Sequence, residues 1–187
     1  MKNPPKIFFM TDAASFNPLP IIARLPPSVG VIIRDYDHPH RAQLATTIRS
    51  ATKNCVLVGK DAALASAINA NGLHCPQYMS AEILQIRQAH PSWLITASAH
   101  SAQAAAQARH ADIIFLSPVF PTASHPDRLA LTKAEIDEIT QNHANVYALG
   151  GVNAQNFLQL KSLGFAGLAA ISAFKDSDFV ATLTAQT

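Results

Sequence analysis

The chain has 187 residues, a formal net charge of +2, and charged side chains at only 14% of its positions. Nearly half of the residues (49%) are hydrophobic, which predicts one compact domain, residues 1–187, with a large core. The small net charge and the lack of a Lys/Arg cluster argue against a nucleic-acid partner. No apolar run is long enough to cross a membrane, so no membrane partner is expected.

The two cysteines, Cys55 and Cys75, are isolated thiols without a C-x-x-C spacing. No basic segment followed by a long apolar stretch opens the chain, so no secretory signal is expected. Both features fit a reduced, cytoplasmic protein. Of the partner classes, a small anionic ligand fits this composition best.

Short apolar runs rich in β-branched residues recur along the chain. Because these runs are continuous rather than alternating, they are typical of strands covered on both faces, as in a parallel sheet. We predict strands at Ile7–Met10, Val29–Ile33, Val56–Val58, Leu73–His74, Trp93–Thr96, Ile113–Leu116, Val146–Leu149 and Gly167–Ile171.

Ala-rich segments that are compatible with helices separate most of these strands. Ser101 and Asn153 stand where helix N-caps are expected. The segment Asn17–Ser28 carries four prolines and can hold only a short helix. The predicted helices are Arg41–Ala51, Ala62–Ala70, Ala81–Ala89, Ala102–Ala108, Lys133–Gln141 and Ala154–Leu163.

Eight strands alternating with helices predict an α/β fold, a closed (β/α)8 TIM barrel. The chain is shorter than the ~200 residues at the lower end of this fold, so its helices and loops must be minimal. An open doubly wound sheet is the alternative. It requires a Gly-rich first turn, which residues 11–14 (TDAA) do not supply. The barrel is therefore favoured.

In such a barrel the chemistry lies where the strands end. Arg34 ends the second strand, where its fork could hold a phosphate or diphosphate, and Lys60 ends the third as a mobile charge. Ser98 and His100 follow the fifth strand and face the same way, because they are two residues apart. The same rule selects Asp12, Asp35, His74, Gln77, Ser117, Thr122, His125, Gly150, Gly151 and Ser172.

Two motifs near the C-terminal end of the chain point to a phosphate site. Residues 148–153 (ALGGVN) and 169–174 (AAISAF) are apolar runs that break into Gly or Ser where a helix should begin. Loops after strands 7 and 8 of a barrel often bind phosphate through backbone N–H groups. Ordinary turns are the alternative interpretation. The Pro-containing loop Ser117–Asp127, after the sixth strand, is expected to cover the site as a lid.

Several of these motifs, in chain order, resemble signatures of the thiamine phosphate synthase/TenI family. The strand 6, 7 and 8 signatures are matched by residues 117–122 (SPVFPT), 148–152 (ALGGV) and 170–173 (AISA). Upstream, residues 6–12 resemble the opening strand, 72–77 (GLHCPQ) its Gly-x-His-x-x-Gln, and 98–100 (SAH) its Ser-x-His. The similarity covers nearly the whole chain.

The resemblance implies a reaction. The synthases join hydroxymethylpyrimidine diphosphate to a thiazole phosphate; diphosphate leaves and the thiazole nitrogen captures the pyrimidine carbocation. By position, Arg34, Ser98 and Thr122 would hold the diphosphate. We predict catalytic roles for Arg34, Lys60, Ser98, His100, Thr122 and His125, and substrate binding by His74, Gln77, Ser117, Gly150, Gly151, Ile171 and Ser172.

The sequence departs from the synthase pattern at the metal site. Synthases carry Asn-Asp after strand 3 and an acidic residue just after the strand 4 Gln, and the two aspartates hold Mg²⁺. Here these positions read Gly59-Lys60 and Tyr78-Met79. Because Mg²⁺ requires oxygen ligands, we expect its requirement to be lost or weakened, with Lys60 supplying positive charge in its place. In addition, the strand 2 Gln-x-Arg-x-Lys survives only as residues 32–36 (IIRDY), and His125 replaces the lid lysine.

Two alternatives to a synthase remain. A TenI-type thiazole tautomerase needs no metal, but its histidine at the start of the strand 6 loop is Ser117 here, so acid–base work would move to His74, His100 or His125. The other is a non-catalytic protein that binds thiazole phosphate or thiamine phosphate. In each case the partner is a small phosphorylated thiazole or pyrimidine. The sequence is compatible with a homo-oligomer and does not set the oligomeric state.

Overall fold

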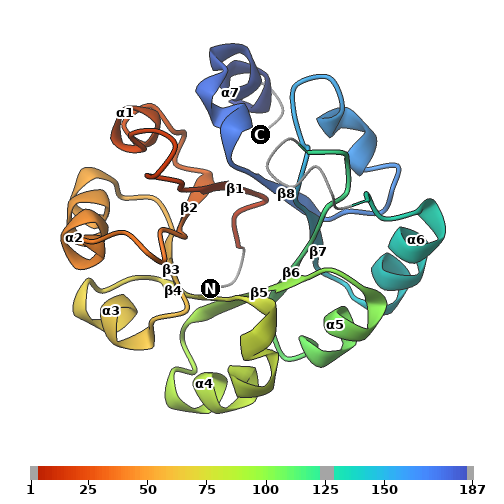
Figure 1. Cartoon of the computed structure of the whole chain (residues 1–187), viewed down its shortest axis with the longest axis horizontal. Helices are drawn as coiled ribbons and strands as arrows, with labels where there is room; N and C mark the ends of the chain where they lie inside the picture. Colours follow the sequence, from red (N-terminus) through yellow and green to blue (C-terminus); the bar gives the residue numbers. More distant parts are fainter. Residues whose placement is uncertain (1–3, 123–128, 185–187) are drawn as a thin grey trace.

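The computed structural model describes residues 4–122 and 129–184. Its parallel strands follow one another in chain order and close into a barrel in which β8 pairs with β1 (Figure 1). This confirms the predicted (β/α)8 fold. The strands are β1 Ile7–Met10, β2 Val29–Ile33, β3 Val56–Gly59, β4 Gly72–Cys75, β5 Leu94–Ala99, β6 Ile113–Leu116, β7 Val146–Ala148 and β8 Gly167–Ala170.

The helices surround the barrel (Figure 1). The α-helices are α1 Leu19–Ile22, α2 Arg41–Ala51, α3 Ala62–Ala67, α4 Ile83–Ala89, α5 Ala102–Gln107, α6 Lys133–Asn142 and α7 Ser177–Thr184. The 3-10 helices are η1 Gln77–Glu82, η2 Phe157–Leu160 and η3 Ser172–Lys175. Within the two described ranges, every helix is too short or too polar to span a membrane.

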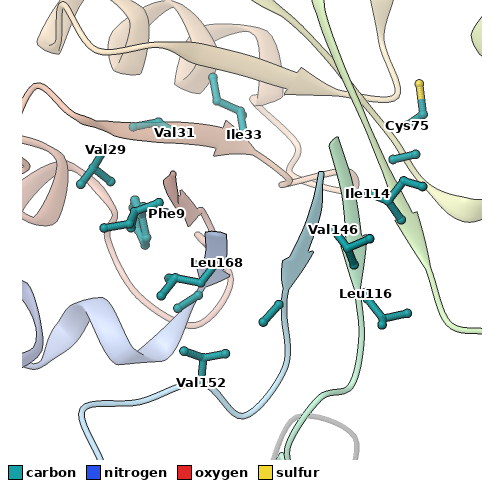
Figure 2. Packing of buried hydrophobic residues seen from close by; sticks show 14 of the residues in the cluster. Phe9, Val29, Val31, Ile33, Cys75, Ile114, Leu116, Val146, Val152 and Leu168 are labelled. Atoms are coloured by element: carbon teal, nitrogen blue, oxygen red, sulfur yellow. The ribbon is translucent and has the colours of Figure 1, made fainter. Parts of the chain in front are cut away.

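Alternation along the strands divides the core into two layers. In β1, Phe8 and Met10 belong to a cluster inside the barrel, whereas Ile7 and Phe9 pack in the layer under the helices. Side chains of the outer layer, including Val29 and other members of the cluster, are drawn in Figure 2. By the same alternation, polar side chains at inward positions near the strand ends are aimed at the barrel mouth.

One predicted helix is wrong. Residues 154–163 form turns and the short η2, not an α-helix. The reason is local: the Asn156 side chain donates to the carbonyl oxygen of Gly151 at 2.8 Å and accepts from the N–H of Asn153 at 2.9 Å. Asn153 in turn accepts from the N–H groups of Gln155 and Asn156, so side chains replace helical backbone bonds.

Other differences concern the lengths of elements. Strand β5 runs three residues beyond its predicted end, because Ala97, Ser98 and Ala99 continue the pairing with β6. Helix α7 was not among the predicted elements. The predicted cap at Ser101 is confirmed, since its hydroxyl accepts from the N–H of Ala104 at 3.2 Å.

Candidate active site

A cavity of about 1140 Å³ lies where the strands end. Every strand except β3 contributes to it, either with its last residues or with the loop that follows. Of the described residues predicted for catalysis or substrate binding, all line this cavity except Lys60, whereas Asp12 and Asp35, selected as strand-end residues, do not. His125 lies outside the described residues, as does most of the second half of the expected lid. The predicted position of the site, at the carboxyl ends of the strands, therefore agrees with the cavity.

A chain of hydrogen bonds crosses the cavity floor between β4 and β5. His74 lies directly opposite Thr96 in the strand register, and its Nδ1 is 2.9 Å from the Thr96 hydroxyl. Its Nε2 is 3.0 Å from the hydroxyl of Ser98, which lines the cavity. Both ring nitrogens are thus engaged within the protein.

The environment of His74 keeps its ring neutral. Burial, followed by the positive charge of Arg34, lowers the pKa of His74 to about 3. A ring that stays neutral near pH 7 and has both nitrogens engaged is poorly suited to general acid–base chemistry. These features argue against an acid–base role for His74, and its contacts orient Ser98.

His100 is held from two sides. Its backbone N–H donates to Gln77 Oε1 at 3.1 Å, and its Nδ1 lies 2.8 Å from the Ser117 carbonyl oxygen and 3.0 Å from the Ser117 hydroxyl. Because a carbonyl oxygen only accepts, Nδ1 carries the proton in the neutral ring, and Nε2 is left as an acceptor. Gln77 and Ser117, both predicted as binding residues, thus fix His100 as well as lining the cavity.

Both positions of the Gly150–Gly151 turn require glycine for structural reasons. Their φ angles are +86° and +69°, in the left-handed region. A Cβ on Gly151 would lie 2.5 Å from the carbonyl oxygen of Pro121, and one on Gly150 2.9 Å from the Cα of Pro118. The Phe120 N–H also donates to the Gly150 carbonyl at 3.1 Å. The glycines let the loop after β6 pack on the loop after β7, a role that the phosphate interpretation did not include.

The β8 end supplies the other part of the expected phosphate site. Ile171 and Ser172 line the cavity, and Ser172, which is exposed, begins η3. The first N–H groups of a helix have no partner inside it, so they can donate outward. We call His74, Gln77, Ser98, His100, Ser117 and the two glycines of the turn the β4–β7 side of the cavity.

The opposite wall carries cations. We call Arg34, Tyr36, Lys60 and Arg41 the β2–β3 side. Arg34 lines the cavity, and its Nε is buried without a hydrogen-bond partner among the described residues. The ammonium of Lys60 lies 4.9 Å from the centre of the Tyr36 ring, and Lys60 does not line the cavity itself. A buried donor without a partner is costly in the folded protein. Because the Arg34 Nε is shielded from solvent, a ligand in the cavity would contact other atoms of Arg34.

Tyr36 was missed by the sequence reasoning, although it lines the cavity. Its N–H donates to the Arg34 carbonyl oxygen at 2.7 Å. Burial raises the pKa of Tyr36 to about 12, against an opposing effect of Arg34, so its phenol stays protonated and can donate. The signal was present: Tyr36 stands two residues after Arg34, the spacing that was used for Ser98 and His100.

No carboxylate lines the cavity among the described residues. Asp35, selected by its place after β2, accepts instead from the Thr11 hydroxyl and from the Ala13 N–H, and is 9% exposed. Asp35 thereby ties the loop after β1 to the loop after β2. Asp12, also selected by position, accepts from the Ser15 hydroxyl at 2.8 Å.

The residues at the family's metal positions do not fit Mg²⁺. Gly59 and Met79 have no oxygen ligand in their side chains, Lys60 carries a positive charge, and the Tyr36 and Tyr78 phenols are weak substitutes for carboxylates. Nor do the described residues hold any group of three or more His, Cys, Asp or Glu side chains that could bind a metal ion.

The comparisons with known proteins show the family of this chain. The model of the family described as Thiamine monophosphate synthase matches residues 29–174. The chain belongs to this family. A protein of Aquifex aeolicus named "Putative thiamine-phosphate synthase 2" is 32% identical over 138 residues, covering 71% of this chain and 74% of that protein. The thiamine-phosphate synthase of Pyrococcus abyssi is 33% identical over 114 residues, covering 59% and 54%.

Solved structures show the same architecture. Thiamine phosphate pyrophosphorylase from Pyrococcus furiosus matches with a TM-score of 0.76 at 22% identity, covering 95% of this chain and 91% of that one. N-(5'-phosphoribosyl)anthranilate isomerase, also from Pyrococcus furiosus, matches with a TM-score of 0.66 at 12% identity, covering 96% and 97%. At these identities the likeness shows a shared barrel. Family membership associates the chain with thiamine biosynthesis.

Proposed function

We propose that the protein is a transferase of thiamine biosynthesis that joins hydroxymethylpyrimidine diphosphate to a thiazole phosphate. The observation that carries this proposal is a cavity of about 1140 Å³ that Arg34 lines without an ion-pair partner among the described residues, and that has no carboxylate among its described lining residues. Such a cavity attracts phosphorylated ligands. Its volume is ample for two small substrates held side by side.

In the proposed reaction the bond between the pyrimidine methylene carbon and the diphosphate oxygen breaks. Diphosphate leaves with the bonding electrons, and the thiazole nitrogen donates its lone pair to the methylene carbon to form thiamine phosphate. Arg34 stabilises the charge that develops on the departing diphosphate, and Ser98 and Thr122 donate to the same group. Holding the two substrates together in a cavity contributes by proximity and by limiting access of water to the cation.

The phosphate of the thiazole is assigned to the opposite part of the mouth. There the backbone of Gly150, Gly151, Ile171 and Ser172 lines the cavity. Outward N–H groups and the Ser172 hydroxyl are suitable donors for a phosphate monoester. The two anionic groups are thus bound at separate positions, with the reacting carbon and nitrogen between them.

The test is chromatographic detection of thiamine phosphate after incubation of the purified protein with both substrates, once with Mg²⁺ and once with EDTA. Product in either sample supports the proposal. Arg34→Met is expected to lower the rate about 100-fold, because a charged donor to the leaving group is lost. Lys6→Met is the matched control, since Lys6 precedes β1 at the far end of the barrel and should leave the rate unchanged. No product in either sample contradicts a synthase.

A non-catalytic binding protein is the second candidate, and the loss of the family's Mg²⁺ ligands, at Gly59-Lys60 and Tyr78-Met79, favours it. It predicts that thiamine phosphate and thiazole phosphate bind in a titration while the reaction mixture yields no product. A tautomerase has less support, because His74 is neutral with both nitrogens engaged and Ser117 replaces the family's histidine. Of the described histidines in the cavity, this leaves the Nε2 of His100 to move the proton.

A further inference from the structure

We infer that Tyr36 and Lys60 complete, with Arg34, a subsite that binds a diphosphate group without a divalent cation. Tyr36 donates its phenol proton to the anion, and Lys60 acts through Tyr36 as a positioning and electrostatic residue. The identity of the ligand as a diphosphate ester rests on the proposed function. In this subsite the positive charges of Arg34 and Lys60 take the place of the Mg²⁺ whose carboxylate ligands this chain lacks.

The position of Tyr36 makes it a direct ligand. The turn closed by its N–H on the Arg34 carbonyl, at 2.7 Å, brings the two side chains to the same wall, and both line the cavity. Among the described residues the Tyr36 hydroxyl makes no hydrogen bond, and the Arg34 Nε makes none either. A phenol donor and a guanidinium fork beside each other match the adjacent anionic oxygens of a diphosphate.

Two cations lie close to the Tyr36 ring. The Lys60 ammonium lies 4.9 Å from the ring centre and the Arg41 guanidinium carbon 6.0 Å away. A Cβ on Gly59 would lie 2.5 Å from Tyr36 Cε1, so the ring occupies space that only a glycine leaves open. Lys60 itself adopts a left-handed φ of +54°, which is unfavourable for a residue with a side chain. Two departures from the family, Gly59 and Lys60, therefore serve one arrangement.

Two of the cations on this side have no ion-pair partner among the described residues. Arg41 pairs with Asp61 at 3.0 Å, whereas neither Arg34 nor Lys60 forms an ion pair among the described residues. The carboxylate that follows Arg34 in sequence, Asp35, accepts from the Thr11 hydroxyl and the Ala13 N–H. Two uncompensated cations and a neutral donor suit a dianionic or trianionic ligand, which takes the place of the missing counter-charge.

The experiment is calorimetric titration of the full chain with inorganic diphosphate in EDTA. The wild-type protein should bind, and adding Mg²⁺ should not strengthen binding. Tyr36→Phe keeps the ring and removes the donor, so its affinity should fall about tenfold, as expected for a hydrogen bond to a charged group. Lys60→Met should weaken binding about fourfold, because the ammonium over the ring no longer strengthens the Tyr36 hydroxyl as a donor, and Lys60→Arg should restore most of it.

A double-mutant cycle tests whether Lys60 acts through Tyr36. In the Tyr36→Phe background, Lys60→Met should change the affinity less than about twofold, because the group through which it acts is gone. Lys6→Met is the matched control: Lys6 lies 5.9 Å above the Tyr147 ring at the far end of the barrel, so it removes an equivalent lysine–tyrosine contact and should leave affinity unchanged. Circular dichroism verifies that each variant is folded.

Three outcomes overturn this inference. They are binding that requires Mg²⁺, wild-type affinity in both Tyr36→Phe and Lys60→Met, and the same loss from Lys60→Met in both backgrounds. Failure of the proposed function is a separate result: diphosphate binds in EDTA as described, but no thiamine phosphate forms from the two substrates. Conversely, product that forms only with Mg²⁺ supports a synthase and contradicts the metal-free subsite.

Discussion

The two sides of the cavity differ in how far their polar groups are hydrogen-bonded within the protein. On the β4–β7 side, the polar groups that the structure describes satisfy one another: His74 joins Thr96 to Ser98, and His100 joins Gln77 to Ser117. On the β2–β3 side, the donors of Arg34 and Tyr36 and the charge of Lys60 lack partners among the described residues.

The β4–β7 side is therefore expected to be rigid without a ligand, whereas the β2–β3 side is expected to be stabilised by one. A satisfied network holds its groups in place whether or not a ligand is present. An unpaired cation at the cavity wall, such as Arg34, with a second one behind it at Lys60, is a cost in the empty protein, and an anion removes that cost when it binds. Substitutions on the β4–β7 side should therefore change stability first, and substitutions on the β2–β3 side should change affinity first.

The largest expected effect is on the β4–β7 side. Gly151→Ala should lower the free energy of unfolding by about 4 kcal/mol, from backbone strain plus contact with the carbonyl oxygens of Phe120 and Pro121. Gly164→Ala is the matched control. Its φ of +85° is equally strained, but its neighbour is the Thr140 side chain, so about 1–2 kcal/mol is expected. Urea denaturation measures both, and equal losses would show that packing at the turn contributes nothing.

The next effect is on the β2–β3 side. Arg34→Met should weaken diphosphate binding about 100-fold, or about 2.7 kcal/mol, while stability stays the same or rises, because an unpartnered buried nitrogen is removed. Asp35→Asn should lower the free energy of unfolding and leave diphosphate affinity nearly unchanged, since it weakens the link to Thr11 and Ala13 but leaves the cavity wall intact. Titration and urea denaturation of both variants decide the matter. A large stability loss in Arg34→Met would contradict the division between the two sides.

The smallest effect is the pH dependence of stability. The folded pKa of His74 is about 3 and its ordinary value 6.5, so between these values the unfolded chain binds more protons. Stability from this group is therefore present above pH 6.5 and is lost as the pH falls. Between pH 6.5 and 5 the loss should be about 1.5 kcal/mol. In His74→Gln this component should vanish from denaturation curves. The same slope in both proteins would mean that His74 already titrates normally.

Sequence patterns predicted most of the fold. The bounds of β1, β2, β6 and α2 were predicted as the structure has them, because continuous apolar runs and a long helical segment leave little choice. The region 154–163 was not, because whether Asn156 bonds to its own helix or to Gly151 depends on the turn before it. An Ala- and Leu-containing segment is compatible with either outcome.

The candidate site divides in a similar way. Residues at strand ends, such as Ser98 and Ser172, could be assigned to the mouth from the alternation of side chains and the barrel rule. The place of Lys60 could not be predicted in this way. Its left-handed backbone departs from the alternation of the strand, and its ammonium lies over the Tyr36 ring, which comes from the loop after β2. The opposite error excluded Tyr36, although it stands two residues after Arg34 and the same spacing had been used for Ser98 and His100.

By itself, the sequence determined that this chain closes a parallel barrel, that its polar strand ends meet at one mouth, and that the family's metal-binding carboxylates are replaced. These follow from periodicity, which is local, and from motifs that stand in one order along the chain. Only the tertiary structure decided which polar groups are already satisfied and which are not. Hydrogen bonds between strands, such as that between His74 and Ser98, and the Lys60–Tyr36 contact depend on register and loop direction, which no short stretch of sequence contains.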